Sequence, residues 1–181
     1  DLAPTMLSLL GLAIPDYMQG QAFLGPKAAP PQQYVFAPRD RVDEVIPCSR
    51  MVFDGRYQYI KNFLPHRPRM PRSWYSEQTM IRQEVRRLAK LGELRDDAAY
   101  LAAGSIPAEE LFDTLADPDE MENLAGRKEF GEIQSRLSGV LRDWMIARLD
   151  TGMIPESMLL SRCAGKPPYE VMRTPGSVDF E

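Results

Sequence analysis

Two short segments that flank the dipeptide Asp54-Gly55 constrain the fold more than any other feature of the sequence. They run over residues 51–53 and 56–60. Glycine adopts positive φ freely and aspartate tolerates it, so the dipeptide favours a tight turn with positive φ at both central residues. Side chains alternate across a strand, so Tyr57 and Tyr59 share one face of the second segment. The pattern predicts a β-hairpin within an antiparallel sheet.

Apolar periodicity predicts the remaining elements. Strands are expected over 34–37 and 110–113, and helices over 2–10, 81–91, 96–103 and 128–149. Asp1 stands where an N-cap belongs, and Gly11 and Gly92 are suited to helix ends. The apolar stripe of 128–149 is typical of a helix that faces a core. These elements combine an antiparallel sheet with helices, which is typical of an α+β fold.

The chain is expected to have three parts. Residues 1–33 form a helix and a loop, residues 34–150 form the sheet-and-helix domain, and residues 151–181 form a proline-rich tail. Because prolines and glycines interrupt the tail, we expect it to be mostly irregular. The first residue is Asp1 and not methionine, and we interpret the chain as part of a larger protein.

Charge excludes some functions and suggests one. Acidic residues number 26 against 22 basic ones, a net charge of −4 that argues against a general nucleic-acid binder. No apolar run approaches the roughly 18 residues of a membrane span. Residues 39–90, however, carry twelve Lys or Arg against six Asp or Glu, a local charge of +6 that leaves −10 elsewhere. Such a field attracts anions to a site, although a solvated helix face is the alternative interpretation.

Cysteine and histidine, which often act as nucleophiles, bases or metal ligands, are scarce. The chain has two cysteines, Cys48 and Cys163, and one histidine, His66. Two cysteines cannot build a zinc site alone, and any Ser-His-Asp triad would depend on His66. We expect both cysteines to be buried thiols without a chemical role.

Three motifs, in this order, resemble the formylglycine-dependent sulfatases. Residues 1–12 resemble the last helix of the catalytic half, residues 50–62 a hairpin of the C-terminal subdomain, and residues 110–125 its "ELYDL..DP.E..NLA" segment. The detail resembles the heparan N-sulfatase-like (sulfamidase-like) branch most closely, mainly through residues 39–44. The resemblance implies that this chain is the C-terminal subdomain of an alkaline-phosphatase-like sulfatase. It also implies an α+β fold in which a small antiparallel sheet packs on a C-terminal helix, the one expected over 128–149.

The same resemblance implies where the chemistry lies. The family's nucleophile is a cysteine that is oxidised to formylglycine within a C-x-P-x-R motif, and neither Cys48 nor Cys163 begins such a motif. We therefore expect no cofactor in this chain, and expect formylglycine and calcium in a catalytic domain N-terminal to it. The chain alone is expected to be inactive. Members of the family are mostly exported, which implies a periplasmic or secreted protein.

The subdomain's loops face the mouth of the active site in this family, and this implies substrate contacts. The candidates are Arg39, Asp43, Glu44, His66 and Arg67, with Arg41 and Arg69 as further cations of the same loops. Guanidinium groups pair with a sulfate or uronate through two parallel hydrogen bonds, and Glu44 is placed to accept from sugar hydroxyls or an amine. The alternative is a set of surface ion pairs.

The sequence thus leads to one functional hypothesis and two rivals. The first is the C-terminal part of a sulfatase that hydrolyses sulfate esters or sulfamates, expected to act on a sugar. Its expected partners are a sulfated sugar or another sulfated small molecule, and the N-terminal catalytic domain. The second is a non-catalytic α+β module that binds anions or a partner through the basic stretch 39–90. The third is a domain that oligomerises through the proline-rich tail.

Overall fold

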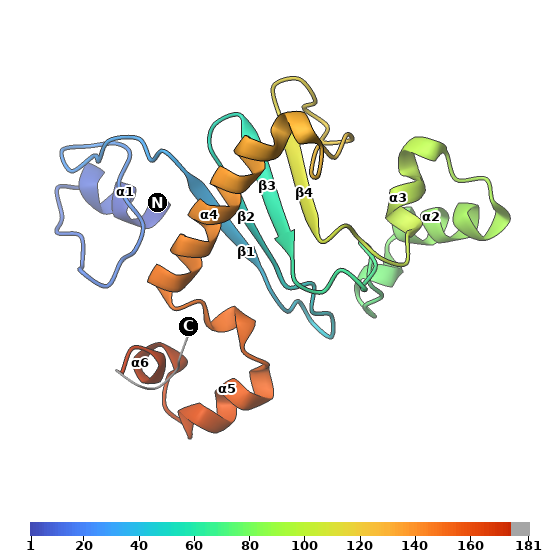
Figure 1. Cartoon of the computed structure of the whole chain (residues 1–181). Coiled ribbons are helices and arrows are strands. Elements are labelled where there is room, and N and C mark those ends of the chain that lie inside the picture. Colours follow the sequence, from blue (N-terminus) through green and yellow to red (C-terminus); the bar gives the residue numbers. More distant parts are fainter. Residues whose placement is uncertain (175–181) are drawn as a thin grey trace. The chain divides into compact units, whose positions relative to one another are not determined.

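The computed structural model describes residues 1–174, which divide into two compact units (Figure 1). The first unit is Asp1–Tyr34, and the second begins at Val35. The first holds α1 (Leu2–Leu9) and a loop that folds back on it. Two buried hydroxyls of α1 hold the loop, because Thr5 Oγ1 accepts from the N–H of Phe23 at 3.1 Å and Ser8 Oγ from the N–H of Lys27 at 2.9 Å.

The ends of α1 differ in part from expectation. Asp1 occupies the N-cap position, but its side chain does not cap the helix. The Oδ1 atom instead accepts a hydrogen bond from the loop N–H of Gln21 at 2.8 Å. The polar residues of α1 face the loop, and its apolar stripe is exposed: Leu2, Met6, Leu9 and Leu10.

The second unit contains the expected sheet. Its four strands are β1 (Val35–Arg39), β2 (Ser49–Phe53), β3 (Tyr57–Asn62) and β4 (Glu109–Asp113). They pair antiparallel in the order β1-β2-β3-β4. The predicted hairpin is therefore confirmed, and the strands expected over 34–37 and 110–113 are present as edge strands of the same sheet.

The turn of this hairpin is built differently from the prediction. The N–H of Asp54 donates to the carbonyl of Tyr57 at 3.2 Å, so Gly55 and Arg56 are the central residues. Gly55 has φ +97°, whereas Asp54 is not among the residues with positive φ. The Asp54 carboxylate accepts from the N–H groups of Arg56 and Tyr57 at 3.0 and 2.7 Å. Its role is that of a side-chain acceptor within the turn.

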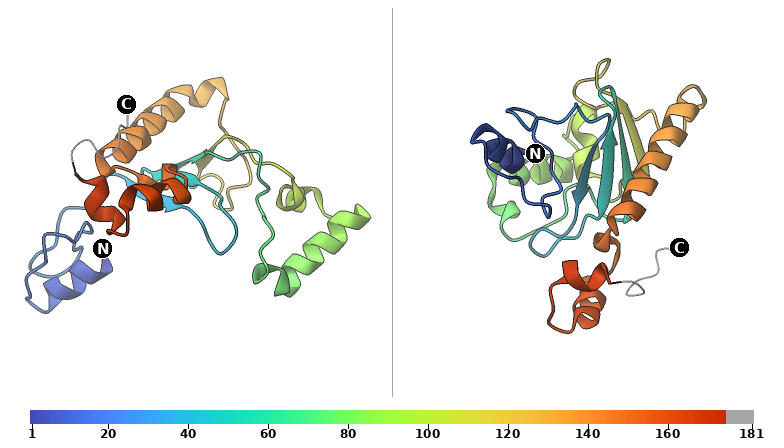
Figure 2. Two further views of the ribbon diagram at one scale, coloured as in Figure 1. Left: turned by 90° about the horizontal axis from the view of Figure 1, so that it is seen from below. Right: turned by 90° about the vertical axis from the view of Figure 1, so that its left-hand side faces the viewer.

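One face of the sheet is covered by α4 (Gly131–Arg148), as Figures 1 and 2 show. Val52, Tyr59 and Leu111 lie opposite one another on β2, β3 and β4 and point to this helix. Leu137 and Leu141 of α4 meet them, and all five side chains are almost completely buried. The stripe expected over 128–149 therefore forms the core with the sheet.

The remaining elements lie between β3 and β4 and after α4. Between β3 and β4 come η1 (Ser76–Gln78), α2 (Met80–Leu91), η2 (Asp96–Ala98) and α3 (Ala99–Ala102). Gly92 ends α2 with φ +69°, as predicted. Before α4 lies η3 (Lys128–Phe130).

The prediction of a mostly irregular tail is wrong for its described part. Residues 151–174 hold η4 (Thr151–Met153), α5 (Glu156–Cys163) and α6 (Pro168–Met172). The prolines stand just before or at the starts of these helices, where a missing N–H and a fixed φ cost nothing. Pro175 and Gly176 lie outside the described residues. Within residues 1–174, no helix has the length and apolar character needed to cross a membrane.

Candidate functional site

A pocket of about 250 Å³ opens on the sheet face opposite α4. Its floor comes from alternate residues of the strands, including Met51 and Ile60. Its rim comes from the β1–β2 loop, the loop 63–72 and the segment before β4. The apolar side chains of the rim are Ile46, Pro47, Pro68, Pro71 and Ile106. We call this hollow the open-face pocket.

Two of the predicted substrate contacts meet in the open-face pocket. Arg39, the last residue of β1, and Arg67, in the proline-containing loop, both line it. Neither guanidinium makes a hydrogen bond or an ion pair with any side chain of residues 1–174. A hollow that contains two unpaired guanidinium groups attracts an anion, and the planar groups suit a sulfate or carboxylate.

A buried polar chain stiffens the floor of the pocket. Ser49 Oγ donates to Asn62 Oδ1 at 2.8 Å, and Asn62 Nδ2 donates to Glu110 Oε2 at 2.7 Å. The other oxygen of Glu110 accepts from Arg69 Nη2. Because Glu110 is paired with Arg69, its negative charge repels an anion in the pocket less than an unpaired carboxylate would. Sequence analysis missed Asn62 and Glu110, although polar residues on one face of two neighbouring strands were a signal for them.

The other predicted contacts lie around the pocket but do not line it. The backbone of Asp43 has φ +51°, and its carbonyl accepts from Arg41 Nη1 at 3.0 Å. The carboxylate of Glu44 accepts a hydrogen bond from the backbone N–H of Trp74, which joins the β1–β2 loop to the segment before η1. His66 is exposed in the loop 63–72.

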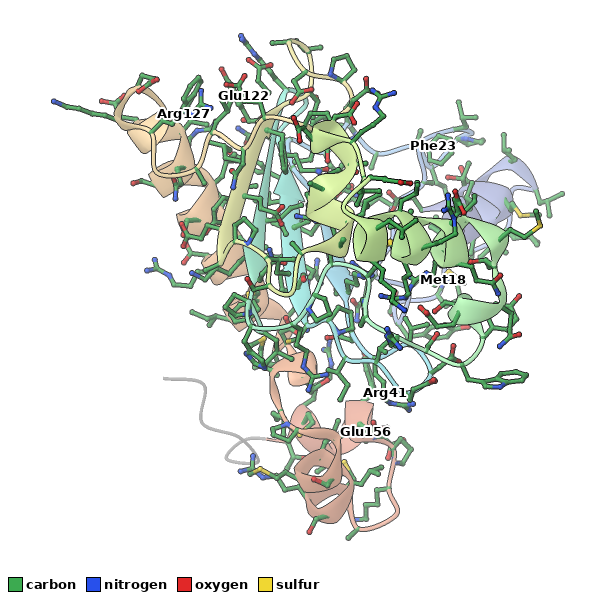
Figure 3. The ribbon with its side chains drawn as sticks, turned by 90° about the vertical axis from the view of Figure 1, so that its right-hand side faces the viewer. Met18, Phe23, Arg41, Glu122, Arg127 and Glu156 are labelled. Atoms are coloured by element: carbon green, nitrogen blue, oxygen red, sulfur yellow. The ribbon has the colours of Figure 1, made fainter. Side chains whose placement is uncertain are left out.

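Arg41 is committed to the tail. Its Nε and Nη2 atoms donate to the two carboxylate oxygens of Glu156 at 2.6 and 3.0 Å (Figure 3). Since Glu156 is the first residue of α5, this pair attaches the β1–β2 loop to α5. Arg39 and Arg41 therefore differ: one guanidinium is paired, and the other faces the pocket.

On the α4 side of the sheet, Arg50 forms a buried ionic cluster. Its side chain is fully buried, and its Nε and Nη2 atoms donate to Asp150 at 2.5 and 2.9 Å. Its Nη1 atom donates to Asp40 at 2.9 Å. Burial opposes the charge, but the hydrogen bonds to Asp150 and Asp40 outweigh it and raise the pKa of Arg50. The cluster fastens β2 to the residues that follow α4.

Both cysteines are buried, as predicted. Cys48 and Cys163 are both buried and free. Burial raises the pKa of the Cys48 thiol, so the reactive thiolate is disfavoured. Nowhere in residues 1–174 do three or more His, Cys, Asp or Glu side chains gather so that they could hold a metal ion.

Comparison with known proteins gives the family. No protein-family model matches the chain. An ulvan-active sulfatase of Formosa agariphila is 36% identical over 162 residues, which cover 90% of this chain and 27% of that protein. The chain corresponds to the C-terminal part of a sulfatase. It thus spans about a quarter of the length of this curated relative.

Solved sulfatases share the fold of this region. The structure of a 2-O GAG sulfatase matches with a TM-score of 0.53 and 22% identity, over 83% of this chain and 25% of that one. A sulfatase solved with its substrate D-glucosamine-2-N,6-O-disulfate matches with a TM-score of 0.53 and 17% identity, over 86% and 25%. The expected α+β class and the C-terminal subdomain of an alkaline-phosphatase-like fold are confirmed. The finer likeness to the heparan N-sulfatase-like branch stays a prediction.

Proposed function

We propose that the protein containing this sulfatase region hydrolyses a sulfate ester or sulfamate on a sugar, and that the open-face pocket holds an anionic group of that sugar. The observation that carries the second part is the pair of unpaired guanidinium groups of Arg39 and Arg67 in one hollow. The names of the relatives support the first part, since they describe activity on ulvan, on GAG and on a glucosamine disulfate.

The role of this region is recognition. A guanidinium group offers two parallel N–H donors to a sulfate or uronate, and it holds its charge at every working pH. Bound in this way, the anionic group would fix the orientation of the sugar while the scissile group lies elsewhere. Asp43, Glu44 and His66 flank the pocket from its loops and remain candidates for contacts with sugar hydroxyls.

The bond-breaking chemistry is assigned to a part of the protein outside this chain. Cys48 and Cys163 are buried and begin no C-x-P-x-R motif, so neither fits a formylglycine precursor. The acidic residues of this chain form no cluster suited to calcium within residues 1–174. By resemblance, formylglycine and calcium belong to a catalytic domain N-terminal to this chain, and the protein is exported to the periplasm or secreted. The chain alone would be inactive.

The test is an assay of the complete protein. We expect the reading frame to encode a C-x-P-x-R motif upstream of Asp1, and the purified protein to release sulfate from sulfated sugars. The 181-residue chain should release none. Replacing both Arg39 and Arg67 by Ala should raise KM at least about tenfold, because charge-assisted hydrogen bonds are lost. No C-x-P-x-R motif upstream, or a protein inactive on every sulfated sugar, would refute the enzymatic proposal.

The same two arginines support one rival. A non-catalytic module that binds sulfated glycans would need them equally, and it would show salt-dependent binding with no catalytic domain encoded upstream. Oligomerisation through the tail stays a prediction, which a dimer lost on truncation after Asp150 would support.

A further inference from the structure

We propose that Trp74 and Tyr75 form a stacking surface for a second sugar of the substrate, beside the open-face pocket. This inference rests on the proposed function and sharpens it, because it requires the substrate to be a chain of sugars. The motivating observation is exposure: the side chains of Trp74 and Tyr75 are 77% and 72% exposed. Adjacent large aromatic side chains in solvent mark a binding surface.

The aromatic pair is held in place by its surroundings. Ser73 is buried, and its Oγ accepts from the N–H of Ser76 at 3.2 Å. The carboxylate of Glu44 accepts a hydrogen bond from the backbone N–H of Trp74. Glu77, just beyond, receives two hydrogen bonds from Arg86, at 2.5 and 2.7 Å. The backbone is therefore fixed on both sides, while the rings themselves stay exposed, and such preorganisation lowers the entropic cost of binding.

The position of the pair points to a neighbouring sugar. The loop that lines the open-face pocket through Arg67 and Pro71 continues directly into Trp74. Three residues span at most about 11 Å, which is the scale of one or two sugar units. A sugar whose anionic group lies in the pocket would therefore have its neighbour within reach of the indole ring.

The charge around the pair suits a sulfated sugar better than an apolar partner. Three of the five Lys or Arg in residues 55–76 are paired with carboxylates, Arg56 with Asp113, Lys61 with Glu109 and Arg69 with Glu110. Of the other two, Arg67 lines the open-face pocket. Arg72, two residues before Trp74, is exposed. The flat face of a sugar ring carries C–H groups that pack on an indole, while its sulfate reaches a guanidinium. In this arrangement Glu44 acts as a positioning residue, because it acts through the backbone of Trp74.

The test compares substrates of two lengths on the complete protein. For Trp74→Ala we expect the ratio of kcat/KM on a sulfated tetrasaccharide to kcat/KM on the matching sulfated monosaccharide to fall about fivefold, the order of one aromatic contact. For Trp74→Phe this ratio should stay close to the wild-type value, because Phe keeps an aromatic ring. Glu44→Ala should lower it, and Glu44→Gln, which keeps an acceptor, should restore it. Tyr17→Ala is the control, since Tyr17 is 71% exposed in the first unit and should leave the ratio unchanged.

A second measurement does not depend on activity. In the complete protein, a sulfated tetrasaccharide should shift the tryptophan fluorescence to shorter wavelength, and Trp74→Phe, which removes this indole, should lose that shift. An unchanged ratio and an unchanged spectrum would overturn the stacking surface while leaving the proposed sulfatase activity intact. A drop in the melting temperature of Trp74→Ala without a change in the ratio would also overturn it, because it would mean that another part of the protein covers the aromatic pair. Complete inactivity would instead refute the proposed function, and the spectrum would still decide this inference.

Discussion

Arg50 and Arg39 leave the same end of the sheet on opposite faces, and their surroundings give them opposite roles. Arg50 of β2 is fully buried on the α4 side and bound by two carboxylates, Asp40 and Asp150. Arg39 of β1 lies on the other side, where it lines a pocket without a partner among residues 1–174. The difference shows that the local excess of positive charge is not one uniform surface. One guanidinium is used by the fold, and the other is available to an anion.

The largest expected effect is a loss of folding stability when the buried Arg50 is replaced. Arg50→Ala should destabilise the chain by about 3–5 kcal/mol, because it leaves the carboxylates of Asp40 and Asp150 without their shared cation. Arg39→Ala should change stability by no more than about 0.5 kcal/mol. Urea unfolding of both variants measures the change in the free energy of unfolding. Equal effects would show that the two arginines do not differ in role.

Gly152 gives a second and smaller test of the same cluster. A Cβ atom at this position would lie 2.0 Å from Arg50 Nη2, so Gly152→Ala should displace the guanidinium and cost about 1–3 kcal/mol. Gly139 of α4 is the matched control, since a Cβ atom there meets nothing within 4 Å. Gly139→Ala should stabilise the helix by up to about 1 kcal/mol. Thermal unfolding of the two variants should therefore shift in opposite directions.

The smallest expected effect concerns acid stability at the far end of the sheet. Arg56 donates to both oxygens of Asp113, and this hydrogen bonding lowers the pKa of Asp113 to about 2. Since the folded-state pKa lies below the ordinary value, the stabilisation is complete above about pH 4 and is lost as the pH falls to about 2. Asp113→Asn should flatten the dependence of stability on pH in that window. Asp143→Asn, which removes an exposed carboxylate, should leave the dependence as it is in the wild type.

Local pattern was sufficient to predict the hairpin, the strands, the core-facing stripe of α4 and the end of α2 at Gly92, whereas the packing of the helix on the sheet was implied by the family resemblance. Local pattern also led to the error in the tail, where prolines at helix starts resembled interruptions. The burial of Arg50 could not be predicted, because its partners lie 10 and 100 residues away. The pairing of Glu44 with the N–H of Trp74 depends likewise on how two distant loops meet.

The residues of the candidate site were predictable only in part, because their ion pairs form with residues far away in the sequence. Arg39 and Arg67 were expected as anion contacts from charge and resemblance, and the fold brings both to the open-face pocket. The resemblance suggested that Arg41 and Arg69 were equivalent to them. Arg41 and Arg69 are instead paired with Glu156 and Glu110, partners that lie more than 40 residues away in the sequence.

The central claim, that the open-face pocket holds an anionic group of the substrate, is tested most directly by one charge-matched comparison. In the complete protein, kcat/KM for a sulfated sugar is measured for the double variant Arg39→Ala with Arg67→Ala. The control is Arg87→Ala with Arg95→Ala, which removes two exposed arginines that are paired with Glu84 and Asp97. We predict a loss of at least about tenfold in the first variant, mainly through KM, and less than about twofold in the control. Equal losses, or none in either variant, would contradict the claim.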